Sequence, residues 1–239
     1  MLCPLCFSRA SAPGVIQGLV PNLIDGGLTH LQYPDDTVIF LSFSSENLLN
    51  IRLILSCYEA MSGMKINFDK SEVFTMGLSE EEQQETVRVL NCKLGSFPMK
   101  YLGMPVSDCK VTKAQLKYVS DKTEKRLGTW QCDYLSSGGK SMLIDSWLSS
   151  IPMYTMGVYQ LYEGSHQLLD TITSRFDWQG TSKKRKYHMI KWEALNRPKE
   201  VGGLGFMDVR AMNISLLAKW IDRLERGDNN LCCSLLRKK

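Results

Sequence analysis

The sequence has little of what marks membrane-spanning, secreted or disordered proteins. No uncharged apolar run approaches the roughly 18 residues that a membrane span needs. The N-terminus, MLCPLCFSRASAPG, lacks a basic start followed by an apolar block. Hydrophobic residues make up 44% and charged residues 23% of the 239 positions, which is ordinary globular usage. We therefore expect an intracellular globular protein, nuclear or cytoplasmic, with no membrane partner.

Metal-binding and nucleophilic patterns are also scarce. The eight cysteines are expected to be reduced thiols, and Cys3 with Cys6 forms a lone CxxC. The three histidines, His30, His166 and His188, are scattered, so no finger-type zinc pattern is present. No spacing indicates a Ser-His-Asp or Cys-His arrangement either. Chemistry must be sought elsewhere in the chain.

Charge is distributed unevenly along the chain. Residues 1–110 carry 8 Lys and Arg against 12 Asp and Glu, whereas residues 111–239 carry 21 against 13. The densest basic run is Lys183, Lys184, Arg185 and Lys186. Such a run can neutralise the phosphates of a polyanion, act as a nuclear localisation signal, or only keep a loop soluble. Charge alone leaves the three interpretations open.

The first half of the chain predicts short strands and two helices. Apolar runs at 30–33 and 37–43 flank Pro-Asp-Asp, a pattern typical of a hairpin. Ser45 can cap a helix running to about Met61, with Gly63 as its stop, and a capping box at Ser79 opens another helix to about residue 90. Strands are predicted at 64–68 and 71–76, and a short strand or turn at 101–106.

The second half has a helical period. Helices are predicted near 112–128, 138–150, 165–176 and 208–226, and Pro152 is expected to end the second of them. Together these patterns predict an α+β protein with two domains, a small mixed unit over 1–110 and a mostly helical unit over 111–239.

Asp35 and Asp36 are the most informative pair of side chains. Adjacent carboxylates at a hairpin tip concentrate negative charge, and the repulsion costs free energy unless water or a cation offsets it. Mg²⁺ is the natural counter-ion because it prefers hard oxygen ligands. The competing interpretation is an exposed polar turn, since Pro-Asp is common turn chemistry.

The run from His30 to Phe40, HLQYPDDTVIF, resembles the Tyr-x-Asp-Asp motif of reverse transcriptases from plant LINE-type (non-LTR) retrotransposons. Further segments resemble later parts of that family in the same order, and the resemblance extends from about residue 20 to the end. These segments are residues 60–71 (a helix followed by a strand), 96–105 (the primer grip), and 135–140 with 198–206 (the thumb and connecting region).

The resemblance implies part of a polymerase palm, made of a hairpin, a helix and short strands, followed by a helical thumb and connection region. It implies two-metal nucleotidyl transfer with Mg²⁺ at Asp35 and Asp36, and Lys70 as a proton donor to pyrophosphate. The expected partners are an RNA template, a DNA primer or an RNA–DNA duplex. Primer and nucleic-acid contacts are implied for Tyr33, Tyr101, Leu102, Gly103, Lys183, Lys184, Arg185 and Lys186.

The sequence departs from the family pattern at two places. The family has a further Asp on an upstream palm strand, whereas Asp25, in a loop-like segment, is the only acidic residue before His30. Pro34 occupies the variable position of the motif, where it fixes φ near about −65° and could change the aim of Asp35. Weak Mg²⁺ binding is therefore expected.

Three hypotheses follow from these departures. The first is a truncated RNA-directed DNA polymerase fragment of retrotransposon origin with little activity alone. The second is a non-enzymatic remnant that binds nucleic acid through the basic half. The third is a drifted sequence whose exposed apolar palm surface leaves it poorly folded. The sequence does not determine the oligomeric state.

Overall fold

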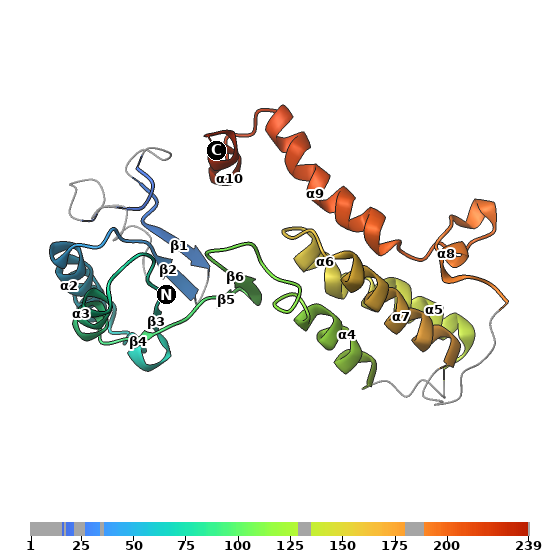
Figure 1. The fold of residues 1–239 in the computed structure, drawn as a ribbon, viewed down its shortest axis with the longest axis horizontal. Helices are drawn as coiled ribbons and strands as arrows, with labels where there is room; N and C mark the ends of the chain where they lie inside the picture. Colours follow the sequence, from blue (N-terminus) through green and yellow to red (C-terminus); the bar gives the residue numbers. More distant parts are fainter. Residues whose placement is uncertain are drawn as a thin grey trace. The chain divides into compact units, whose positions relative to one another are not determined.

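The computed structural model of the chain describes residues 16, 18–21, 27–33, 36–128, 135–179 and 189–238. They form two compact units, one made of Met1–Cys109 with Asn229–Lys239 and the other of Lys110–Asp228. The last segment thus groups with the first unit, whereas the sequence analysis placed it in the helical half. Figure 1 shows short strands confined to the first unit and helices throughout the second. This mixture fits the α+β class, and the palm and thumb assignments stay predictions.

The described residues of the first unit form three two-stranded sheets and the helices between them. Its hairpins are β1 with β2 and β5 with β6, both antiparallel, whereas β3 and β4 pair in parallel. The elements are β1 (His30–Tyr33), β2 (Asp36–Ile39), α2 (Ser45–Ser62), η1 (Phe68–Lys70), β3 (Glu72–Val73), α3 (Glu80–Leu90), β4 (Lys93–Leu94), β5 (Met99–Tyr101), β6 (Met104–Val106) and α10 (Leu231–Lys238).

Helix α2 supplies the apolar core of this unit. Ile51 is 1% exposed and packs with Ile16, and Ile39 of β2 lies against the same cluster. The predicted helix is confirmed, and Gly63, whose φ of 68° suits a residue without a Cβ, is its C-cap. The predicted cap is wrong, because Ser45 is the first helical residue and Ser44 is the N-cap, without a side-chain cap hydrogen bond. The core packing of α2 fixes β2, the strand that begins at Asp36.

Helix α3 confirms the predicted capping box. The Ser79 side chain accepts from the Glu82 backbone N–H, and the Glu82 carboxylate accepts from the Ser79 N–H at 2.8 Å. The α2 and α3 helices are tied by Arg52, which donates to the Val89 carbonyl, and by Ser45, which donates to Glu85 at 3.3 Å. These hydrogen bonds hold the two helices against each other.

The second unit is built of helices, with no strand among its described residues. Two apolar clusters form its core, one around Ile144, Phe176 and Trp192 and the other around Met156 and Leu161. The elements are α4 (Tyr118–Gly128), α5 (Ser137–Leu143), η3 (Ile144–Leu148, a π-helical turn), α6 (Ser150–Met156), α7 (Glu163–Gln179), α8 (Trp192–Leu195), η4 (Lys199–Val201) and α9 (Val209–Glu225).

Pro152 does not end a helix, contrary to the prediction. It lies in the first turn of α6, where the missing backbone N–H costs little, and it is buried. The preceding turn is widened into a π-turn, in which the Ser149 N–H and hydroxyl both donate to the Ile144 carbonyl, at 3.1 Å and 2.8 Å. The predicted single helix over 138–150 is therefore interrupted, and helical structure continues past the proline to Met156.

Asn213 is the polar centre of the helical unit. Its side chain is 1% exposed and donates to the carbonyls of Met156 and Tyr159, at 2.9 Å and 3.0 Å. Its Oδ1 accepts from the Leu161 N–H at 2.8 Å and lies 3.3 Å from Nε2 of buried His166. One side chain of α9 thereby satisfies backbone hydrogen-bonding groups at the end of α6 and in the loop between α6 and α7. A partly buried ion-pair cluster nearby, Arg210 with Glu163 and Asp170, joins α9 to α7.

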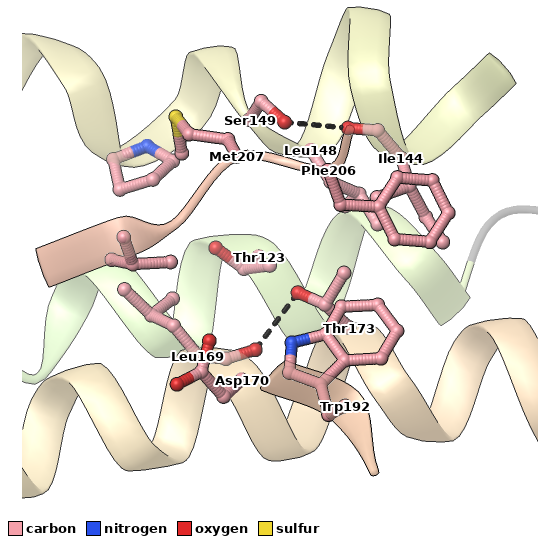
Figure 2. A pocket seen from close by; sticks show the side chains of 12 residues that line it. Thr123, Ile144, Leu148, Ser149, Leu169, Asp170, Thr173, Trp192, Phe206 and Met207 are labelled. Carbon is pink, nitrogen blue, oxygen red and sulfur yellow. Dashed lines mark hydrogen bonds between the residues drawn. The ribbon is translucent and has the colours of Figure 1, made fainter. Parts of the chain in front are cut away.

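A small cavity lies between α4, α6 and α7 (Figure 2). Its volume of about 20 Å³ suits a single water molecule rather than an organic ligand. The hydroxyls of Ser149 and Thr173 that line it donate to carbonyls of their own helices, those of Ile144 and Leu169. It is a packing defect of the core. No described helix has the length and apolarity required to cross a bilayer.

We predict that Asn213→Ala lowers the unfolding free energy of the helical unit by about 3 kcal/mol, because two buried carbonyls and one N–H lose their partner. Urea unfolding followed by tryptophan fluorescence measures this, since all five tryptophans lie in residues 111–239. Ser215→Ala, on an exposed face of α9, is the control and should change the midpoint little. Equal midpoints for Asn213→Ala and wild type would contradict the prediction, and a non-cooperative wild-type transition would favour the poorly folded state.

Candidate functional site

The Tyr-x-Asp-Asp segment forms the predicted hairpin. Strands β1 and β2 pair in the register His30 with Ile39 through Tyr33 with Asp36. Only Pro34 and Asp35 lie between the paired ends, and these two residues fall outside the described residues. The side chains of Tyr33 and Asp36 are both exposed, the tyrosine at 59%. The register therefore presents one carboxylate of the predicted metal pair at the solvent-facing end of the hairpin, beside an exposed tyrosine.

The opposite end of the hairpin is anchored in the core. Ile39 packs against the α2 cluster, and the Phe40 N–H donates to the Thr29 carbonyl at 2.8 Å, which extends the pairing by one residue. His30 begins β1, with Nδ1 3.0 Å from the Thr29 hydroxyl. Partial burial lowers the pKa of His30 below its ordinary value, because desolvation disfavours the charged ring. The hairpin is thus fixed at its base and exposed at its tip.

Lys70 lies at the end of η1, between the two segments for which strands are predicted. The predicted strand at 64–68 is wrong, because Asn67 accepts from the Lys70 N–H at 3.1 Å and caps a turn of 3-10 helix instead. The predicted strand at 71–76 shrinks to Glu72–Val73, paired with β4. Lys70 is exposed to solvent. A long lysine side chain on an exposed turn is free to reach a ligand.

The predicted primer-grip segment is a tight hairpin. Met99–Tyr101 pairs with Met104–Val106, and Leu102 and Gly103 form the two-residue turn with φ of 50° and 81°. Positive φ at both positions is the type I′ geometry that matches the twist of the strands. Glycine adopts this conformation at no steric cost, whereas leucine does so at a cost. The expectation of a strand or a turn at 101–106 is confirmed, with both present.

Lys100 is a further candidate that the family motif did not single out. It is exposed on β5 between two half-buried neighbours, Met99 and Tyr101. Strand alternation places its side chain on the face opposite that of Tyr101. In the sequence, alternation with a period of two in this segment is the signal that identifies Lys100 as the exposed residue.

The predicted site residues lie on three separate elements of the first unit. The β1–β2 hairpin carries Tyr33 and Asp36, η1 carries Lys70, and the β5–β6 hairpin carries Tyr101, Leu102 and Gly103. Within the described part of the chain, no three His, Cys, Asp or Glu side chains gather into a metal-binding group. The other predicted positions, Asp35 and the run Lys183, Lys184, Arg185 and Lys186, lie outside the described residues.

No family model matches the sequence. An Arabidopsis thaliana protein named "Putative ribonuclease H protein At1g65750" is 32% identical over 136 residues, which cover 57% of this chain and 22% of that protein. The A. thaliana "Uncharacterized mitochondrial protein AtMg00310" is 33% identical over 91 residues, which cover 38% of this chain and 59% of that protein.

Both relatives are plant proteins. Their names fit derivation from a plant retroelement, and they do not point to reverse transcriptase specifically. The chain spans less than two thirds of the length of either relative, so neither name carries an activity over to it.

We predict that His30 titrates below its ordinary range in the folded protein. Because the folded pKa is lowered, its contribution to stability is present above the unfolded pKa and is lost as the pH falls through the folded pKa. Proton NMR of the ring signals measures the midpoint, and His30→Asn assigns the signal. A midpoint at or above that of the urea-unfolded chain would show that the base of the hairpin does not desolvate the ring.

Proposed function

We propose that this chain is the palm hairpin and helical region of a plant retroelement reverse transcriptase, and that Asp35 and Asp36 bind Mg²⁺ for nucleotidyl transfer. The observation that carries the proposal is the register of β1 and β2. It leaves a two-residue connection, so that Asp36 opens β2 directly opposite Tyr33. The order of the other motifs along the sequence supports the same assignment.

The chemistry proposed depends on the two carboxylates. Mg²⁺ held by them would supply Lewis-acid chemistry for nucleotidyl transfer, polarising a primer 3′-hydroxyl and neutralising charge on the triphosphate and on the leaving pyrophosphate. Asp35 and Asp36 would hold the ions, Tyr33 would lie beneath the primer end, and Lys70 would donate a proton to pyrophosphate. The β5–β6 hairpin would hold the primer backbone through Tyr101, Leu102 and Gly103. With two adjacent carboxylates as the ligands, the affinity for Mg²⁺ is low.

A second function is favoured by the charge of the helical half. Residues 111–239 carry a net charge of +8, and 8 basic against 2 acidic residues fall within 175–199. Such a surface binds RNA or DNA through phosphates whether or not catalysis occurs, because neutralising phosphates releases condensed counterions. A non-enzymatic nucleic-acid-binding protein is therefore the alternative to a polymerase.

We predict that Mn²⁺, used as a probe for Mg²⁺, selectively broadens the amide signals of β1 and β2 in NMR spectra, and that Mg²⁺ competes. Asp35→Asn with Asp36→Asn should abolish the broadening, since both ligand carboxylates lose their charge. Asp108→Asn, which neutralises an exposed carboxylate in the same unit, is the matched control and should leave it unchanged. Broadening that persists in the double variant would contradict the metal assignment.

Primer extension separates the two functions. Extension that is Mg²⁺-dependent and lost in Asp35→Ala supports the polymerase, whereas extension unchanged in that variant excludes catalysis by this site. Nucleic-acid binding in the absence of Mg²⁺, with no extension, supports the alternative function.

We predict that neutralising Lys183, Lys184, Arg185 and Lys186 to glutamine weakens RNA or DNA binding and flattens its salt dependence. The slope of log K against log salt should fall by up to about 3–4, if each cation contacts one phosphate. Fluorescence anisotropy at several salt concentrations measures both quantities. Neutralising four exposed lysines of the same half, Lys113, Lys117, Lys122 and Lys125, is the comparison. The same affinity and slope in the first variant as in wild type would show a merely solvated loop.

A further inference from the structure

Helix α2 carries an exposed apolar ridge on the face away from its core. Leu49 is 60% exposed, Leu53 is 63% exposed and Met61 is 72% exposed, and the exposed thiol of Cys57 completes the spacing of four. We define Leu49, Leu53, Cys57 and Met61 as the α2 ridge. Residues spaced by four form one continuous row on a helix surface. Contiguous exposed apolar surface of this kind marks an interaction site in soluble proteins.

Small side chains lie beside this ridge. The next row on the exposed side contains Arg52, Ser56 and Ala60, all exposed. The Arg52 guanidinium donates to the Val89 carbonyl of α3, which leaves the two small residues next to the ridge. Bulky side chains next to small ones are what packing of ridges into grooves requires. Because the ridge and these small residues lie on the same face of one helix, a second α2 can supply the complement of each.

The spacing of the ridge is symmetrical about Leu55. In an antiparallel pair of α2 helices, Leu53 of one copy faces Cys57 of the other, and Leu49 faces Met61. Leu53 thus meets the small side chain of Cys57, and Leu49 meets the flexible side chain of Met61. A two-fold pair of this kind uses the same patch on both copies and closes on itself.

Charge at the ends of the ridge favours the same antiparallel pairing. Glu46 lies beside one end, in the first turn of α2, and Lys65 follows the other end, and both are exposed. Antiparallel alignment about Leu55 brings the acidic end of one copy to the basic end of the other, whereas parallel alignment would bring like charges together. The middle of the ridge carries no charged residue.

We propose that the α2 ridge is a self-association surface, on which a second copy of this chain packs with its α2 antiparallel. The contact is one helix wide, so the association is weak and reversible. The proposal is independent of metal binding and of polymerase activity.

Sedimentation equilibrium of the full chain at tens to hundreds of micromolar tests the association. Wild type is expected to populate dimer, and Leu53→Glu should weaken dimerisation at least about tenfold by placing a charge in the centre of an apolar contact. Ile214→Glu is the matched control, because Ile214 is 62% exposed on α9 and lies outside the ridge. A monomeric wild type, or equal weakening in both variants, overturns the proposal.

A cysteine crosslink tests the orientation. In Leu53→Cys, mild oxidation should join the introduced thiol of one copy to Cys57 of the other, because these positions face each other in the antiparallel pair. Peptide mapping identifies the linked pair, and Gln84→Cys on exposed α3 provides a thiol away from the ridge. Crosslinking no faster than in Gln84→Cys overturns the arrangement. A further outcome would also overturn the proposal. If wild type is monomeric and Leu53→Glu unfolds at a lower urea concentration, the ridge is covered by another part of the same chain.

Discussion

The pairing of β1 with β2 is the constraint on which the functional interpretation rests. A side-chain period of two means that a slip of one residue would exchange the faces of the whole strand. Ile39 resists such a slip because it is held in the core by Ile16 and Ile51. With that end fixed, the opposite end of the register puts Asp36 across from Tyr33. Apolar burial at the base of the hairpin thus determines where the carboxylate lies at its tip.

Local signals in the sequence predicted the elements whose ends are fixed by backbone chemistry. The Ser79 capping box, the stop at Gly63 and the Pro-Asp-Asp hairpin each depend on interactions within a few residues, and each is present. Signals that depend on tertiary context failed. The alternating pattern at 64–68 pairs with no strand among the described residues, and the Asn67 side chain accepts from the Lys70 N–H instead. Pro152 is accommodated because a π-turn precedes it and because it lies in the first turn of α6.

The residues of the candidate site show the same difference between local signals and tertiary context. The sequence could place Tyr33 and Asp36 on a hairpin, and Leu102 and Gly103 in a turn, because motif and local geometry coincide there. It could not specify that Lys70 ends a helical turn, since this depends on which strands pair. The exposure of Lys100, in contrast, follows from the period of two in β5. The polar centre at Asn213 carries no local signal, because its partners lie 47 or more residues away.

Helix α2 has two apolar faces with different roles. Its inner face, with Leu48, Ile51 and Tyr58 buried, packs against β2, the strand that begins at Asp36. Its outer face leaves Leu49, Leu53 and Met61 exposed to water. The inner contact is made within the unit and fixes the base of the hairpin, so the position of Asp36 does not require the outer face to be covered. The outer ridge remains available for contact with a second copy, because exposed contiguous apolar surface favours association. One helix therefore serves two purposes through opposite faces, and a charge placed on the outer face leaves the hairpin contact intact.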